Sequence, residues 1–248
     1  MNPGKIIFAT AVASLFALAQ SKAQFTFTID FEEDLSSNPL LGGQEIDDEF
    51  LPLFKVGATN NGNGPDAAVL YDTDAVPGTG GDDATDLTNP YTGGNISSID
   101  PGNLLIIQEN SSFSGGLFTN PDDEADGGLL SFAFAPDLIT GFGFDVFDIE
   151  NNETNGFEVT VNGSILLDIA FYTGLTNPNG TLEFGNDTAN RLNFVTADDL
   201  GVEFIETLDI ELKGSGAIDN LKLSAVPEPS AVALLGLGLG SLFIRRRR

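Results

Sequence analysis

The sequence lacks cysteine, histidine and tryptophan, and each absence excludes a class of function or of structural device. Without cysteine no disulfide can form, so stability must come from a hydrophobic core, from bound metal or from both. Without histidine and cysteine the chain has no Ser-His-Asp or Cys-His catalytic machinery and no histidine zinc site. Without tryptophan it also lacks the largest aromatic stacking residue for a sugar ligand.

Basic residues are scarce: the 248 residues contain 10, against 37 acidic ones. Six of the basic residues lie near the two ends of the chain, whereas every acidic residue except Glu228 lies between residues 24 and 225. This central segment has 36 acidic and 4 basic residues, a formal charge of −32. Such a charge repels nucleic acid and anionic lipid, which excludes both as partners of the segment, and it favours divalent cations.

Residues 1–23 have the pattern of a secretory signal peptide. Lys5 precedes an apolar run over residues 6–19, and Ser21 and Ala23 are small residues at the positions that a signal peptidase reads. We therefore expect export, with cleavage after Ala23 or, alternatively, after Ala19. A retained N-terminal membrane helix is the competing interpretation.

Three features follow one another in residues 226–248. Pro227, Glu228 and Pro229 are held extended, because proline lacks a backbone donor and disfavours helix at the residue before it. Residues 230–244 carry no charge and predict a transmembrane helix of about 22 Å, short for a hydrocarbon layer of about 30 Å. Basic clusters beside a span stay on the cytoplasmic side, which orients the chain; here the cluster is Arg245, Arg246, Arg247 and Arg248.

The order of a Pro-Glu-Pro motif, a short apolar span and terminal arginines resembles the PEP-CTERM sorting signal of Gram-negative bacteria. The resemblance implies that an exosortase recognises Pro227, Glu228 and Pro229 while the precursor is anchored in the inner membrane. It also implies transfer to the cell envelope, cell surface or extracellular matrix, with signal peptidase and exosortase as processing partners and extracellular polysaccharide as a further partner. An ordinary tail anchor behind a Pro-rich linker is the alternative.

Residues 24–225 predict one all-β domain, flanked by the signal peptide and the transmembrane helix. Apolar and polar residues alternate in 25–31 and 157–161 with the period of a half-buried strand, and Asn162-Gly163 is a two-residue hairpin signal. About ten or more antiparallel strands indicate a jelly-roll-like β-sandwich, with Phe142 and Phe144 in its core. A single helical turn is expected at 197–200, and further strands at 50–56, 67–71, 104–109, 129–135, 139–149, 164–171, 192–194, 208–212 and 218–223.

Acidic residues at the two ends of this domain predict a metal site. The first and last strands of a sandwich often lie side by side, so Asp30 and Glu32 are expected to converge with Asp219 and Asn220. Oxygen ligands suit a hard cation, and six to eight of them favour calcium over magnesium. The sequences Ile29-Asp30-Phe31-Glu32 and Ala217-Ile218-Asp219-Asn220-Leu221 are also similar to carbohydrate-binding-module sandwiches, a resemblance that implies structural calcium. Solvated strand ends are the alternative.

Two further acidic groups lie in loops. The first spans residues 72–74 and 81–86 and either binds calcium or is a solvated acidic loop; its candidate ligands are Asp72, Asp82, Asp83 and Asp86. The second, residues 122–126, is interpreted as a solvated run of charge.

Together these features favour a non-catalytic, calcium-stabilised protein of the cell surface or extracellular matrix. One alternative is an anchored glycan-binding module that uses Tyr71, Tyr91 and Tyr172. A more remote alternative is a glycoside hydrolase with a pair of catalytic carboxylates.

Overall fold

The computed structural model describes residues 24–74, 87–88, 90–96, 99–149 and 156–226. The expected signal peptide, sorting motif, transmembrane helix and arginine cluster lie outside these residues. Thr26–Ser224 form one compact unit. Among the described residues, no helix combines the length and the apolar character needed to cross a membrane.

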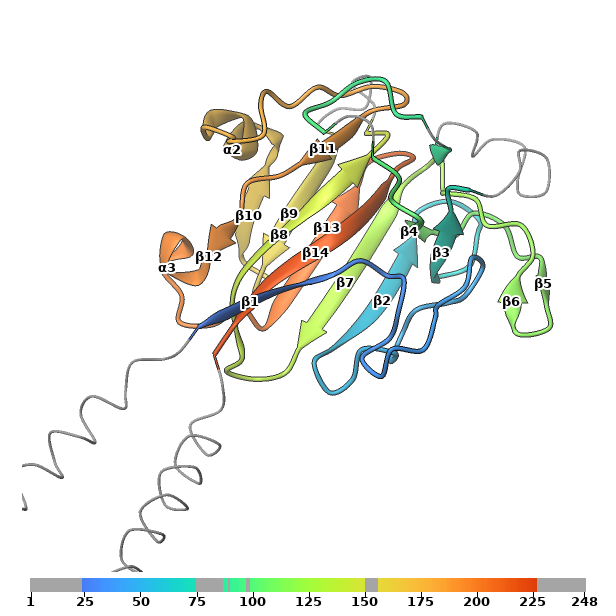
Figure 1. Ribbon diagram of the computed structural model, residues 1–248, viewed down its shortest axis with the longest axis horizontal. Helices are drawn as coiled ribbons and strands as arrows, with labels where there is room; N and C mark the ends of the chain where they lie inside the picture. The colour runs from blue at the N-terminus through green and yellow to red at the C-terminus, as the bar shows by residue number, and fades with distance from the viewer. Residues whose placement is uncertain (1–23, 75–86, 89, 97–98, 150–155, 227–248) are drawn as a thin grey trace, which may run out of the picture. The chain divides into compact units, whose positions relative to one another are not determined.

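Seven strands form the larger sheet (Figure 1). Its path runs β11-β8-β14-β4-β3, with β1 paired to β14 and β12 paired to β8. The first and last strands of the chain therefore meet, as the sequence predicts. The strands of this sheet are β1 (Phe25–Ile29), β3 (Ala68–Asp72), β4 (Asn103–Ile107), β8 (Ile139–Phe147), β11 (Ala189–Arg191), β12 (Val195–Thr196) and β14 (Ala217–Ala225).

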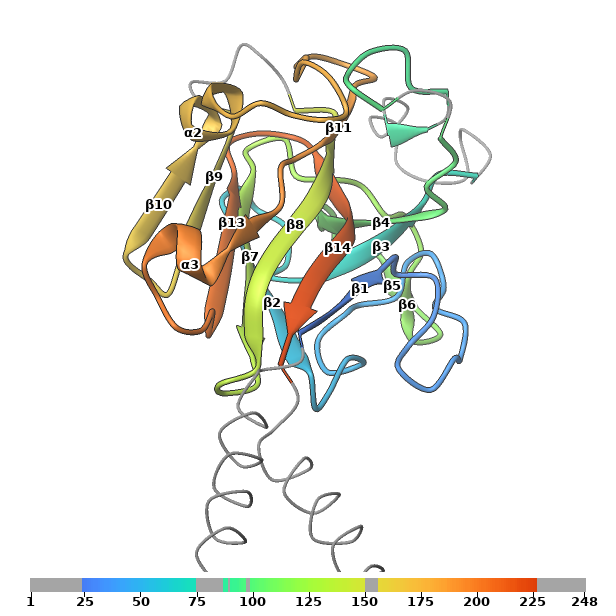
Figure 2. The ribbon, with the colours of Figure 1, turned by 60° about the vertical axis from the view of Figure 1, so that its left-hand side comes forward.

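Five strands form the second sheet, in the order β10-β9-β13-β7-β2, and Figure 2 shows the two sheets as separate layers. Neighbouring strands in it are antiparallel. Burial alternates along them, because successive side chains of a strand point to opposite faces. The strands are β2 (Phe54–Asn60), β7 (Gly128–Phe134), β9 (Phe157–Val161), β10 (Ile165–Asp168) and β13 (Thr207–Leu212).

Phenylalanine rings fill much of the core. The ring of Phe50 stacks on Phe54 with centroids 5.0 Å apart, and Phe54 meets Phe132 edge to face at 5.8 Å. Phe142 and Phe144 are buried, which confirms their predicted core position. Burying a side chain of this size contributes about 1.5–3 kcal/mol, so these rings supply much of the stability that disulfides would otherwise give.

The hairpin predicted at Asn162-Gly163 is confirmed, but three residues, 162–164, join its strands in place of the expected two. Strands β9 and β10 pair antiparallel, with Ile165 opposite Val161. The backbone φ angles of Asn162 and Gly163 are 51° and 64°. The β-turn type that matches the twist of paired strands needs positive φ at both of its central residues. Asn162 and Gly163 are these central residues, and both residue types adopt positive φ at low cost.

The strand predicted over residues 164–171 is only half right. Strand β10 ends at Asp168, whose side chain accepts a hydrogen bond from the Phe171 N–H at 2.8 Å and begins helix α2 (Ile169–Gly174). This cap satisfies a helix N–H that would otherwise lack a partner, and Tyr172 of the helix is buried against the ring of Phe157. Capping and burial therefore outweigh the strand preference of the sequence.

Two other differences are local. The expected strand at 192–194 is instead the break between β11 and β12, which both pair with β8. A two-stranded hairpin that the sequence analysis missed consists of β5 (Phe113–Ser114) and β6 (Leu117–Phe118). The helical turn is confirmed as α3 (Ala197–Leu200), and the jelly-roll connectivity stays a prediction.

Candidate metal centre

An acidic pocket of about 330 Å³ opens where β1, β14 and the connection between β3 and β4 meet. It brings together all four residues that the sequence analysis placed on the first and last strands. Among the described residues, eight line it and five of them are acidic: Asp30, Glu32, Asp74, Asp100, Pro101, Gly102, Asp219 and Asn220. The concentration of oxygen ligands in one hollow is the arrangement that a hard cation requires.

Asp219 is the buried carboxylate of this pocket. It lies in β14, and its residue is 1% exposed. The Oδ2 atom accepts a hydrogen bond from Asn220 Nδ2 at 2.7 Å, whereas Oδ1 accepts none from the described residues. Burial raises the pKa of Asp219 to about 8, a hydrogen bond from the Asn220 backbone opposes the shift, and the charges of Asp145, Asp30 and Glu32 add to it.

Asn220 shares the pocket with Asp219 because the backbone of β14 departs from regular strand geometry there. Consecutive residues of a regular strand point to opposite faces. The φ angle of Asn220 is 50°, in the left-handed region that asparagine tolerates better than most residues. This local twist lets two adjacent side chains line one pocket and bond to each other.

Asp30 and Glu32 reach the pocket from the end of β1. The Oδ1 atom of Asp30 accepts the Glu32 N–H at 3.2 Å, and Glu32 Oε1 accepts the Asn103 N–H at 2.6 Å. A Cβ at Gly102, whose φ is 71°, would lie 2.1 Å from Glu32 Oε1, so only glycine leaves room for this carboxylate. Burial raises the pKa of Glu32, the Asn103 N–H opposes the shift, and neighbouring acidic groups add to it.

An ion pair supports the pocket beneath Asn220. Asp145 in β8 accepts hydrogen bonds from Arg191 Nε at 2.8 Å and Arg191 Nη2 at 2.6 Å. Its Oδ2 atom also accepts from Asn220 Nδ2 at 3.2 Å. Burial raises the pKa of Asp145, although the Arg191 and Asn220 contacts favour its charged form. The sequence analysis missed this pair, since Asp145 and Arg191 meet only through the pairing of β8 with β11.

The predicted loop ligands are placed differently. Asp72 does not line the pocket: its Oδ1 accepts the Asp74 N–H at 2.9 Å, and Asp74 lines the pocket in its place. Asp100 is a further lining residue that the sequence analysis missed. The other three predicted loop residues, Asp82, Asp83 and Asp86, lie outside the described residues.

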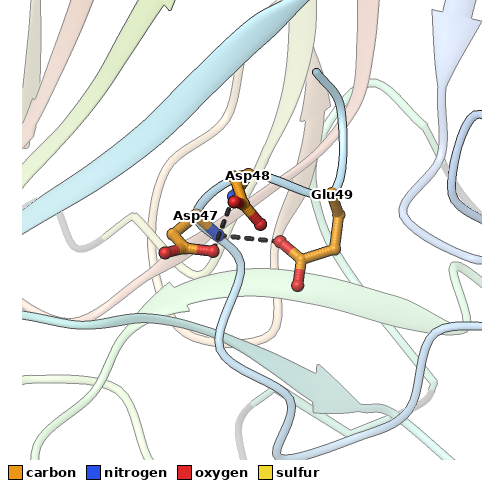
Figure 3. A group of neighbouring side chains, drawn as sticks. All are labelled: Asp47, Asp48 and Glu49. Carbon is orange, nitrogen blue, oxygen red and sulfur yellow. Dashed lines mark hydrogen bonds between the residues drawn. The ribbon is translucent and has the colours of Figure 1, made fainter. Parts of the chain in front are cut away.

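A second acidic group occupies a turn before β2 (Figure 3). Oxygens of Asp47, Asp48 and Glu49 all lie within 4.8 Å of one another, and it is the one such triple among the described residues. Its carboxylates serve the turn itself, because Glu49 Oε2 accepts the Asp47 N–H at 2.9 Å. Among the described residues, no three carboxylates of the acidic pocket have oxygens that all lie this close together.

The third acidic group of the sequence was wrongly interpreted as solvated. Asp122, Asp123 and Glu124 are all buried. Asp123 Oδ2 accepts the Gly216 N–H at 2.6 Å, which ties this segment to the turn before β14. The three residues therefore have a structural role inside the fold.

The tyrosines that a glycan site would use are also buried. Tyr71, Tyr91 and Tyr172 each expose 6% or less of their surface. The hydroxyl of Tyr91 donates to the Leu87 carbonyl at 2.7 Å, and Tyr172 packs on Phe157. These three rings are therefore not exposed for a sugar to stack on, and the prediction that they form a glycan site is wrong.

The C-terminal residues 225–248 match the PEP-CTERM protein-sorting motif. This match confirms the resemblance noted for Pro227, Glu228 and Pro229, and the motif implies a protein that is exported, processed by an exosortase and sorted to the cell surface. Those three residues, the arginines 245–248 and the expected signal peptidase site at Ala23 lie outside the described residues. A comparison of the chain with curated proteins gave no match.

Proposed function

We propose that the protein is a non-catalytic surface or matrix protein whose β-sandwich binds calcium in the acidic pocket. The observation that carries this proposal is Asp219, a pocket-lining residue 1% exposed whose Oδ1 is buried and accepts no hydrogen bond from the described residues. Burying a charged oxygen without a partner is costly, and a bound cation supplies the missing partner.

The ligand set suits calcium better than magnesium. The pocket offers carboxylates from three segments that are distant in sequence, together with the amide of Asn220. Magnesium demands near-octahedral geometry at about 2.0–2.1 Å, whereas calcium accepts 6–8 oxygens in irregular arrangements. A site assembled from several carboxylates and an amide on separate segments therefore favours the larger and more tolerant ion.

The composition of the pocket supports a structural role. Among its described lining residues there is no aromatic side chain on which a sugar ring could stack. The carboxylates come from the segment directly after β1, from β14 and from the connection between β3 and β4. An ion bound by all three would join distant parts of a domain that has no disulfide.

Thermal unfolding of the full-length chain in mild detergent tests the proposal. A ligand that binds only the folded state stabilises it by about 2.7 kcal/mol at one hundred times its Kd. For a domain of this size that is a rise in Tm of about 5–10 °C with calcium relative to chelator. Magnesium at the same concentration is expected to give a smaller rise. A Tm that neither calcium nor chelator changes would overturn the proposal.

A matched pair of variants assigns the effect to the pocket. Asp219→Asn removes the buried charge and is expected to abolish most of the calcium-dependent rise in Tm. Asp209→Asn is the control. It replaces the same carboxylate by the same amide, and Asp209 is half-buried in β13 of the other sheet. Equal responses of the two variants would contradict a site at Asp219.

A further inference from the structure

Strand β1 is the least buried strand of the larger sheet. Phe25 is 50% exposed, Thr26 and Thr28 are exposed, and Ile29 is the one residue of the strand that is buried. Its partner in the sheet is β14. Strands are held mainly by the apolar area that their side chains bury, so β1 has little of its own to hold it in place.

The chain is held far more firmly directly after β1. The side chain of Phe31 is fully buried and its ring meets Phe50 at 5.8 Å. The carbonyl of Phe31 accepts a hydrogen bond from Asn103 Nδ2 at 3.2 Å. The φ angle of Phe31 is 57°, so the backbone bends sharply between β1 and this anchor. The bend separates a weakly held strand from a firmly held segment.

The acidic pocket lies at this junction. Asp30 follows the last residue of β1, and Asp219 belongs to the strand on which β1 is paired. Without a cation, the charges of Asp30 and Glu32 disfavour a further charge on Asp219, and no ligand joins the side chains of the two strands at the junction. With a cation between them, the same groups attract one common ion.

Resting on the calcium site proposed above, we infer that the ion fastens β1 to β14, so that β1 is docked with calcium and released without it. Phe31 and everything after it stay folded in both states, because their burial does not depend on the ion. Loss of calcium is therefore a local opening of the first strand and not an unfolding of the sandwich.

Hydrogen exchange of the full-length chain, followed by mass spectrometry with calcium chloride or with chelator, tests this inference. Peptides covering Phe25–Ile29 are expected to exchange at least about tenfold faster in chelator, as for a local opening. Peptides covering β9, which lies in the other sheet, are expected to exchange equally in both conditions. Asp219→Asn should keep β1 in fast exchange even with calcium, and Asp209→Asn should behave as the unaltered chain.

Calorimetric titration of calcium on the same samples separates the outcomes. Binding of calcium without any change in β1 exchange overturns the inference and leaves the proposed site intact. Loss of protection in β1 and β9 together also overturns it, since the ion would then hold the whole sandwich. Absence of calcium binding refutes the proposed site itself, and the inference falls with it.

Discussion

Replacing Arg191 by methionine tests the ion pair beneath the acidic pocket. The change keeps the apolar stem of the side chain and removes both hydrogen bonds to Asp145, which is 1% exposed. Breaking a buried pair costs about 3–5 kcal/mol, because the remaining charge loses its counter-ion. The side chain of Arg191 is itself 45% exposed, and solvent screening reduces the expected cost to about 2–3 kcal/mol.

Urea unfolding of the full-length chain in chelator measures this cost without a contribution from calcium. The Arg191→Met/Asp145→Asn double variant is expected to recover part of the loss, because no buried charge then lacks a counter-ion. Lys213→Met is the matched control. Lys213 pairs with Glu158 at 3.1 Å and Glu211 at 2.6 Å, and these carboxylates are 22% and 41% exposed, against 1% for Asp145, so its loss should cost no more than about 1 kcal/mol. Equal effects of Arg191→Met and Lys213→Met would refute the reasoning from burial.

Three further predictions concern the core, a turn and the tail. Phe54→Ala should lower the free energy of unfolding, measured in urea, by about 3–5 kcal/mol, because Phe54 is buried among other rings. Phe113→Ala is the control and should cost less than about 1 kcal/mol, because Phe113 is 57% exposed. A similar cost for both variants would contradict the core assignment. Asn162→Ala should lower the free energy of unfolding by about 1–2 kcal/mol, because alanine disfavours the positive φ and loses the side-chain hydrogen bonds to the backbone of Phe204 and Glu206. Asn162→Gly should lower it by less, since glycine tolerates positive φ. A larger loss for glycine than for alanine would contradict the turn assignment. Replacing Pro227 and Pro229 by alanine should leave an unprocessed precursor in the membrane fraction of the native host on an immunoblot, and normal processing would argue against recognition of this motif.

Much of the fold follows from local sequence pattern. Period-two alternation locates β9 and β13, and Asn162-Gly163 fixes the turn after β9, because each signal arises within a few consecutive residues. Helix α2 was not predicted, because the residues around Asp168 have the pattern of a strand. In the structure the Asp168 side chain caps the first turn of the helix instead. Strand β12 was missed for a related reason, because two residues carry too little periodic signal to be recognised.

Part of the candidate site was also within reach of the sequence. Asp30 and Asp219 were expected to converge because they lie on the first and last strands, and β1 does pair with β14. The choice of Asp74 over Asp72 was not predictable, since it depends on how one loop turns against another. The same holds for Asp123, whose burial depends on a backbone N–H of Gly216 that is distant in sequence.

Titration of calcium into the full-length chain by isothermal calorimetry tests the central claim most directly. The account predicts saturable binding to the unaltered chain and to Asp209→Asn, and binding to Asp219→Asn weakened by at least about tenfold, which is 1.4 kcal/mol. Equal binding by Asp219→Asn and Asp209→Asn, or no binding by the unaltered chain, would contradict it.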